Sequence, residues 1–287
     1  MPHAVQIIEP ARITSHVVFA SPHSGRIYPR NMLERAQVEL SVLRSSEDAY
    51  VDLLLADAPG FGAPLITTEV PRAYVDFNRA ETELDPALIA GAPRGALNPR
   101  VASGLGVIAR VVANGRQIYR GKITMAEAEA RIRDYWRPYH AAVGTMLERQ
   151  HARFGQVLLC DIHSMPHEAL AGHVLRGGKR PDVVLGDRFG AACGADLLAR
   201  VQAIFEHAGL RVARNSPFAG AYIAQRYGQP AHGMHVIQIE IDRRLYLDEA
   251  RIEPGPGFEA FRSLMRGIIQ QIAASGSQAG APKMAAE

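Results

Sequence analysis

Short apolar runs alternate along the chain with segments whose apolar residues recur at helical spacing. Runs of apolar and β-branched residues predict strands at 16–21, 64–70, 73–78, 156–162, 182–187 and 235–241. Several of these runs lack strict alternation, which is typical of central strands that are covered on both faces. The pattern therefore predicts a three-layer α/β domain around a central, twisted sheet that is mostly parallel or mixed.

Helical spacing occurs in four segments, at 46–58, 124–150, 187–209 and 256–274. The second of these opens with Thr124 and Glu127, a T-x-x-E capping box, so we expect its helix to begin there. Pro138 lies inside the same segment. It predicts a kink or a break, because proline lacks the N–H that an inner helical turn needs.

These segments form one continuous series, and we expect a single α/β domain over residues 1–274. The tail at 275–287 consists mainly of small and polar residues, so we expect it to be flexible. Residues 91–116 are rich in Gly, Ala, Pro and Asn. Because a long loop within a compact domain is often functional, we expect this segment to be a lid or a binding segment.

Composition narrows the class of protein. The chain has 287 residues, of which 47% are hydrophobic, and this is enough for one large core. Its 32 basic and 29 acidic residues form no long basic run, so we expect no nucleic-acid partner. Cys160 and Cys193 lack CxxC spacing, and no stretch approaches the ~20 apolar residues of a membrane span. We therefore expect a cytoplasmic monomer or homodimer that binds no membrane.

Three of the predicted strands carry residues that burial penalises unless they are paired or bound. His23 follows the first strand, His163 directly follows the run at 156–162, and Glu240 lies inside the last strand. Open α/β sheets bind ligands outside the carboxyl ends of their strands, so we expect these side chains to meet. Asp161 stands two residues before His163 on the same face, where it could accept the second ring N–H of that histidine.

Two histidines and one carboxylate are the three protein ligands typical of catalytic zinc, with a fourth position open for water. Glu47 and Asp48 are the candidate carboxylates, and either could instead be a helix-start acid that interacts with the helix dipole. A lone histidine such as His23 is more often a satisfied polar residue than a ligand. Glu240 could also face solvent if its strand lay at a sheet edge. His232 and His235 stay open as further site residues.

A second cluster surrounds the run at 73–78, where Arg72, Asn78 and Arg79 flank a mostly apolar stretch. An arginine fork matches a carboxylate bidentately, so a strand that ends in Asn-Arg beside a cleft could clamp a substrate carboxylate. Surface salt bridging is the alternative for each arginine.

With these residues assembled, the sequence resembles the N-formylglutamate amidohydrolase (deformylase) family from about residue 15 to 270. The resemblance rests on "PHSG", "RSSEDAYVD", "PRAYVDFNR", "CDIHS", "DVVLGDRFG", "NSPFAGAYIAQRYGQPAHG" and "HVIQIEIDRRLYLDE" in that order. This family is similar, more distantly, to the zinc carboxypeptidases and aspartoacylases. The resemblance implies a carboxypeptidase-like (phosphorylase/hydrolase-like) fold.

The resemblance also implies His23 and His163 as zinc ligands, Asn78 and Arg79 as carboxylate binders, and Glu240 as general base. The carboxypeptidase ligand pattern is H-x-x-E, but Arg26 stands three positions after His23 here. The acidic ligand must therefore come from elsewhere. The resemblance to the deformylases favours Asp48, with Glu47 as the alternative.

We therefore expect a metal-dependent hydrolase with one zinc ion, which cleaves an N-formyl or similarly short N-acyl acidic amino acid such as N-formyl-L-glutamate. Residues 1–274 are then its catalytic domain. Residues 217–230 could cover the site with Tyr222 and Arg226, and either Arg72 or Arg226 could bind a second carboxylate. The rival interpretations are a deacylase or peptidase for another N-acyl amino acid, and a metal-binding or ligand-binding relative without turnover.

Overall fold

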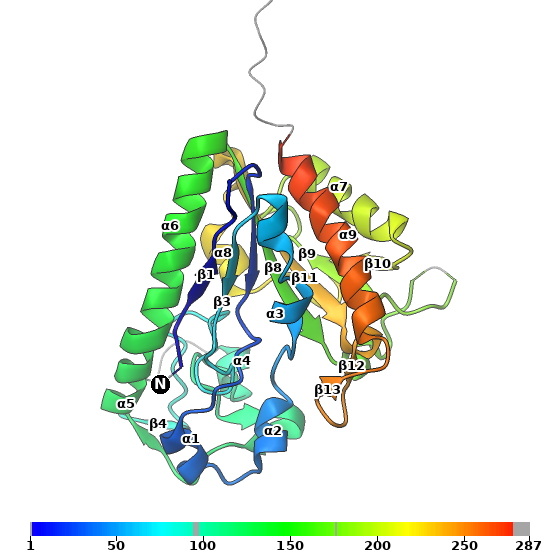
Figure 1. The fold of residues 1–287 in the computed structure, drawn as a ribbon. Coiled ribbons are helices and arrows are strands. Elements are labelled where there is room, and N and C mark those ends of the chain that lie inside the picture. The colour runs from blue at the N-terminus through cyan, green and yellow to red at the C-terminus, as the bar shows by residue number, and fades with distance from the viewer. Residues whose placement is uncertain (1, 94–97, 176, 278–287) are drawn as a thin grey trace, which may run out of the picture.

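A mixed sheet forms the centre of the molecule in the computed structural model, which describes residues 2–93, 98–175 and 177–277 (Figure 1). Within these residues the sheet has seven strands. Their order across the sheet is β1 (Gln6–Ile8), β3 (Leu65–Thr67), β2 (Val17–Ser21), β8 (Val157–Met165), β11 (Met234–Asp242), β9 (Val183–Gly186) and β10 (Val212–Arg214).

The four central strands, β3, β2, β8 and β11, run parallel to one another. Strand β1 is antiparallel to β3, and β9 is antiparallel to β11. The carboxyl ends of β2, β8 and β11 therefore meet at one edge of the sheet. This arrangement confirms the expectation of a mixed α/β sheet.

Helices cover both faces of the sheet, and the strands contribute alternate residues to the two cores. Val17 and Phe19 of β2 belong to the core that also includes residues of α3 (Val51–Leu54), α7 (Ala195–His207) and α9 (Phe258–Ser277). Val18 and Ala20 belong to the opposite core, with residues of α6 (Arg137–Phe154) and α8 (Tyr222–Tyr227). Figure 1 shows α6 on one side of the sheet and α7 and α9 on the other.

Short elements fill the connections. They are α1 (Arg30–Arg35), α2 (Leu40–Arg44), η1 (Ala58–Phe61), β4 (Ile89–Ala90), α4 (Pro99–Ala102), β5 (Val111–Val112), η2 (Ala113–Gly115), β6 (Arg116–Gln117), β7 (Ile123–Thr124), η4 (His167–Leu170), η5 (Pro230–His232), η6 (Arg243–Leu245), β12 (Leu247–Asp248) and β13 (Glu253–Pro254). Among the described residues of the predicted segment 91–116, several short elements therefore replace one long loop.

The helix predicted from Thr124 begins there, because the Thr124 hydroxyl accepts a hydrogen bond from the Glu127 N–H at 3.1 Å. The helix continues through α5 (Met125–Arg131) and the single π-helical turn η3 (Ile132–Trp136) into α6. Pro138 lies in the first turn of α6, directly after the π turn. Because Pro138 has no N–H to donate, the wider turn accommodates it and the helix continues without a break.

Several elements differ from the sequence-based prediction. Residues 73–78 form turns instead of a strand, because Pro71 O accepts the N–H groups of Tyr74 and Val75 and folds the chain back. The helix predicted at 46–58 begins only at Val51, since Tyr50 before it has a left-handed backbone with φ of 63°.

The helix predicted at 187–209 begins at Ala195. Arg188 and Phe189 have φ angles of 56° and 57°, and the Asp187 carboxylate binds the Gly190 N–H at 3.0 Å, so residues 187–190 form a tight turn. At the chain end, α9 extends to Ser277, three residues past its predicted end. The rest of the predicted flexible tail, 278–287, lies outside the described residues.

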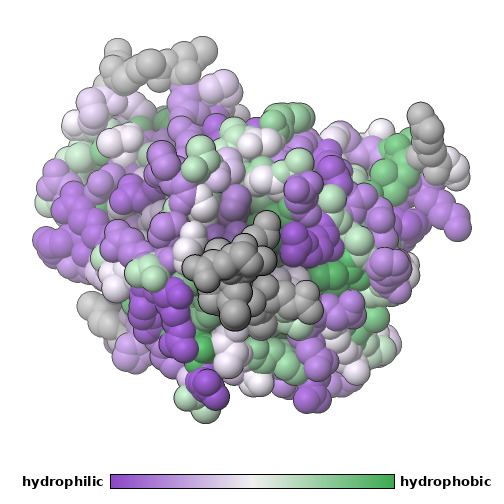
Figure 2. All heavy atoms as spheres, turned by 90° about the horizontal axis from the view of Figure 1, so that it is seen from above, coloured by the Kyte–Doolittle hydropathy of each residue, from purple (hydrophilic) through white to green (hydrophobic). Residues whose placement is uncertain are grey.

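In the described part of the chain, every helix is too short or too polar to span a bilayer. Figure 2 shows the molecule from the end where α6 and α9 finish, and hydrophilic residues predominate there with apolar ones in small separate groups.

Candidate metal and substrate site

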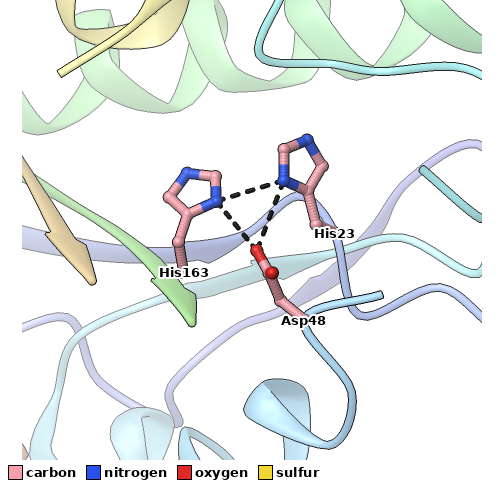
Figure 3. Close-up of side chains that lie close together, drawn as sticks. All are labelled: His23, Asp48 and His163. Atoms are coloured by element: carbon pink, nitrogen blue, oxygen red, sulfur yellow. Dashed lines mark hydrogen bonds and ion pairs between the residues drawn. The ribbon is translucent and has the colours of Figure 1, made fainter. Parts of the chain in front are cut away.

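Three buried side chains from separate segments meet at the carboxyl edge of the sheet (Figure 3). His23 follows β2, Asp48 lies in the turn before α3, and His163 lies near the end of β8. His23 Nδ1 is 3.1 Å from His163 Nδ1, and Asp48 Oδ2 is 3.0 Å from His163 Nδ1 and 3.3 Å from His23 Nδ1. Three potential ligand atoms therefore converge on one point.

The convergence fits a metal ion. A tetrahedral zinc site with bonds of about 2.0–2.1 Å separates its ligand atoms by roughly 3.3 Å, close to the three distances here. The donor set of two imidazole nitrogens and one carboxylate oxygen suits zinc and leaves a fourth position for water or substrate. In the described residues, these three form the one group of at least three His, Cys, Asp or Glu that could hold an ion.

Each histidine has a second carboxylate near its Nε2. His23 Nε2 lies 2.8 Å from Asp76 Oδ1, and His163 Nε2 lies 3.0 Å from Asp161 Oδ2. His23 donates its Nε2–H to Asp76 and so presents the lone pair of Nδ1 as a ligand, whereas Asp161 lies at ion-pair distance from His163 without hydrogen-bond geometry. Asp161 therefore stands where the sequence predicted it. Asp76 was missed, although it lies two residues before Asn78 in "YVDFN", because that stretch was interpreted as a strand.

Asp48 is held from its other side by Arg243, which the sequence analysis did not single out. Arg243 Nη2 lies 3.1 Å from Asp48 Oδ1, and Arg243 also donates to Ser164 Oγ at 3.2 Å. Burial alone raises the pKa of Asp48, but His163 and His23 outweigh it and hold that pKa well below its usual value. Asp48 is therefore an ionised carboxylate at the centre of the cluster.

Glu47, the alternative acid, has different partners. Its Oε1 accepts hydrogen bonds from Tyr28 Oη at 2.8 Å and from Arg44 Nε at 3.2 Å. Burial raises the pKa of Glu47, against the opposing effect of Arg44. Of the two adjacent acids, the backbone turns Asp48 toward the histidines and Glu47 toward Arg44.

Two segments approach each other closely at Gly25, two residues after His23, and this explains why a glycine occupies the position. A Cβ atom on Gly25 would lie 2.1 Å from the carbonyl oxygen of Val70. A side chain at this position would therefore push apart the loop that carries His23 and the segment that leads to Asp76.

Glu240 is a fourth candidate functional residue, and it lies beside the cluster of His23, Asp48 and His163. Strand β11 lies between β8 and β9, so Glu240 is not on a sheet edge, and its register partner in β8 is His163. The residue is 8% exposed, and its Oε1 accepts a hydrogen bond from Gln238 Nε2 at 2.8 Å. Burial raises the pKa of Glu240, although the charge of His163 opposes this effect.

A cavity of about 620 Å³ opens beside the cluster, and His23, His163 and Glu240 line it. This volume is within the usual range for a small-molecule site. The described residues of the segment 91–116 contribute much of its wall, from Arg100 to Gly115. The segment therefore lies where a binding role requires it.

Arg72, Asn78 and Arg79 also line the cavity. Arg72 Nε lies 3.1 Å from Asp76 Oδ2, so its charge is already paired. Asn78 Oδ1 accepts the Ile223 N–H at 2.8 Å, and its Nδ2 donates to Gln238 Oε1 at 3.1 Å. The side chain of Asn78 thus links three segments of the wall.

The two residues predicted to cover the site, Tyr222 and Arg226, are not among the residues that line the cavity. Arg226 Nη1 donates to the Tyr222 hydroxyl at 2.7 Å, and the guanidinium lies over the Trp136 ring at 5.7 Å. Helix α8 turns both side chains toward α6. The preceding residues, 217–221, line the cavity in their place.

His232 and His235, which the sequence left open, lie away from the cluster. His235 is at the start of β11, where its Nδ1 accepts the Gly194 N–H at 3.2 Å. His232 belongs to η5, and its Nδ1 lies 3.3 Å from Gln229 Oε1. Neither residue lines the cavity.

Comparisons with known proteins agree with one another. Residues 15–247 match a family described as N-formylglutamate amidohydrolase. An N-formylglutamate deformylase of Pseudomonas aeruginosa is 30% identical over 270 residues, which are 91% of this chain and 94% of that protein. An N-formylglutamate deformylase of Pseudomonas putida is 29% identical over 240 residues, which are 81% of this chain and 82% of that protein.

Solved structures extend this result to the fold. The crystal structure of an N-formylglutamate amidohydrolase from Ralstonia eutropha JMP134 superposes with a TM-score of 0.88 at 34% identity, covering 96% of this chain and 98% of the other. A gene product of Agrobacterium tumefaciens gives a TM-score of 0.66 at 17% identity and covers 96% and 94% of the two chains. This second likeness shows a shared fold.

Proposed function

The chain belongs to the N-formylglutamate amidohydrolase family, and from this premise we propose that it hydrolyses N-formyl-L-glutamate, or a similarly short N-acyl acidic amino acid. With N-formyl-L-glutamate the products are formate and glutamate. The observation that carries this proposal is the buried cluster of His23, Asp48 and His163 beside Glu240 in a cavity that arginines line.

His23, Asp48 and His163 would hold one zinc ion through the two Nδ1 atoms and Asp48 Oδ2. When bound, zinc supplies Lewis acidity, which makes water a stronger acid and a carbonyl carbon a stronger electrophile. Asp76 and Asp161 keep the two rings in the orientation that points Nδ1 inward. Arg243 and the histidines keep Asp48 ionised and in place.

Glu240 is the general base of the proposed reaction. Its carboxylate accepts one proton from the attacking water, whose oxygen forms a bond to the formyl carbon. The same proton then moves to the amide nitrogen as the C–N bond breaks, and formate and the free amino acid leave. The raised pKa of Glu240 favours this exchange, since a base that holds its proton more firmly is the better acceptor and can still return the proton.

Release of formate tests the proposed activity. We expect the purified protein to release formate from N-formyl-L-glutamate, to lose this activity after dialysis against a chelator, and to regain it with added zinc. A panel of other N-acyl amino acids and short peptides separates the rival deacylase or peptidase. A protein that binds zinc but releases nothing from any member would overturn the proposal in favour of a non-catalytic relative.

Zinc stoichiometry tests the ligand assignment. We expect His163→Ala and Asp48→Asn to abolish stoichiometric zinc, because a catalytic site with three protein ligands cannot lose one without a large loss of affinity. Glu47→Gln is the matched control for Asp48→Asn. It removes the neighbouring charge and should keep one zinc per chain. Full zinc content in Asp48→Asn, or loss in Glu47→Gln alone, would contradict the assignment.

A further inference from the structure

Within the described residues, four arginines line the cavity, and they fall into two pairs. Arg72 and Arg243 are each joined to a carboxylate of the site, Asp76 at 3.1 Å and Asp48 at 3.1 Å. Arg79 and Arg100 form no ion pair with any carboxylate in the described part of the chain. Two positive charges are therefore free to bind an anion from outside.

Leu105 connects the segments that carry these two cations. Arg79 Nε donates to the Leu105 carbonyl at 2.9 Å, and the Leu105 N–H donates to the Arg100 carbonyl at 2.9 Å. One residue thus links the guanidinium of Arg79 to the backbone that carries Arg100. Burial lowers the pKa of Arg79, and the charges of Arg72 and Arg100 lower it further against the effect of Asp76.

The backbone around Arg100 is anchored. Asn98 Oδ1 accepts the Arg100 N–H at 2.9 Å, and Asn98 Nδ2 donates to Glu83 Oε2 at 3.1 Å. On the other side of α4, Arg110 Nη2 donates to the Ala102 carbonyl at 3.1 Å. The Glu83 carboxylate accepts hydrogen bonds from Asn98 and from the Ala80 N–H and, in the described residues, forms no ion pair with Arg100. These bonds fix the backbone of the short helix, which carries the exposed side chain of Arg100 at the cavity wall.

Two unpaired arginines in one cavity destabilise the empty site and stabilise a bound dianion. Two like charges near each other repel, and each guanidinium keeps its proton at any ordinary pH. A ligand with two carboxylates on a short chain relieves the repulsion between the two arginines. Each carboxylate then forms charge-assisted hydrogen bonds with one guanidinium. A ligand with one carboxylate leaves one of the two cations unpaired.

We propose that Arg100 is the specificity-determining residue for acidic substrates, binding the side-chain carboxylate while Arg79 binds the α-carboxylate. This inference rests on the proposed function and deepens it. It replaces Arg72 and Arg226, the cations that the sequence suggested for a second carboxylate. Arg72 is paired with Asp76, and Arg226 lies outside the cavity lining.

The test compares kcat/KM for N-formylglutamate and N-formylglutamine, which differ only in the side-chain carboxylate. We expect the unmodified protein to prefer N-formylglutamate by roughly tenfold or more, the lower end of what a hydrogen bond between charged groups contributes. Arg100→Gln should abolish this preference while kcat/KM for N-formylglutamine changes little, which also shows that the variant is folded. Arg100→Lys keeps the charge without the fork and should keep part of the preference.

Arg116→Gln is the matched control, since Arg116 is an exposed arginine of the same segment and does not line the cavity. Its preference should equal that of the unmodified protein. An unchanged preference in Arg100→Gln, or a preference that Arg226→Gln alone abolishes, would overturn this inference and leave the proposed function intact. Absence of hydrolysis of every N-formyl substrate by the unmodified protein would overturn both.

Discussion

At the scale of single residues, the site depends on groups that each have two partners. Asp48 contacts the histidines through Oδ2 and Arg243 through Oδ1, and each histidine has a carboxylate at Nε2. A buried charge is tolerated only when it is paired, so this network explains how so many ionisable groups share one buried cluster. Glu240 differs from them, because its side chain accepts a hydrogen bond from the neutral amide of Gln238.

This difference leads to a prediction for Glu240→Gln. The substitution keeps the shape and the contact with Gln238 but removes the base, so we expect turnover of N-formylglutamate to fall by ~10²-fold or more. Zinc content should stay at one ion per chain, because Glu240 is not among the three converging ligand groups. Steady-state kinetics and metal analysis of the same preparation check both points. Near-normal turnover would remove Glu240 from the mechanism.

At the scale of elements, the π turn η3 determines how the long helix contacts the turns at 73–79. The Arg137 N–H bonds to the Ile132 carbonyl, and the ring of Trp136, the last residue of η3, packs against the ring of His140 in α6. Trp136 Nε1 donates to the Arg79 carbonyl at 2.9 Å, and His140 Nε2 lies 2.9 Å from the Phe77 carbonyl. Two side chains of one helix thus hold the backbone on both sides of Asn78.

We predict that Trp136→Phe weakens substrate binding more than catalysis. The variant leaves the buried Arg79 carbonyl without its donor, which costs about 1–3 kcal/mol and loosens the backbone of Arg79. KM for N-formylglutamate should rise severalfold, whereas kcat should change less, because the metal ligands and Glu240 are untouched. Tyr139→Phe is the control on the same helix, since in the described residues its buried hydroxyl has no hydrogen-bond partner. A larger fall in kcat than rise in KM would contradict this role.

At the scale of the whole molecule, stability depends on a neutral histidine buried where three segments meet. His140 of α6 contacts the Phe77 carbonyl and the Tyr227 hydroxyl at the end of α8, each at 2.9 Å. Burial lowers the pKa of His140 from 6.5 to about 3. Between these two values the unfolded chain binds a proton that the folded protein does not, so the free energy of unfolding falls as pH falls through this window.

We therefore predict acid-sensitive stability below pH 6.5. His140 alone should contribute a slope of about 1.4 kcal/mol per pH unit within the window. Urea unfolding at several pH values between 7 and 4 measures the slope. His140→Gln removes the titrating group and can still donate to the Phe77 carbonyl, so its slope should be smaller than that of the unmodified protein by about this amount. Equal slopes would show that His140 does not govern the acid response.

Much of the framework could be predicted from the sequence by itself, because it depends on local patterns. The apolar runs of β8 and β11, the capping box at Thr124 and the polar residues at strand ends all follow from neighbouring residues. Those patterns were sufficient to predict that His163 and Glu240 lie at one edge of a sheet, because the carboxyl ends of parallel strands meet there.

Only the tertiary structure decided which of several similar residues faces the site. Asp48 and Glu47 are adjacent acids, and the hydrogen bond from the Asp48 N–H to the His23 carbonyl at 3.0 Å holds Asp48 beside the histidines. Residues 73–78 form turns that Pro71 O closes locally, and the bond from the Asp76 N–H to the distant Val107 carbonyl holds them in place. Arg100 could not be distinguished from the other arginines, since an unpaired charge is defined by which carboxylates the folded chain leaves within reach. Local periodicity contains no information about such long-range pairing.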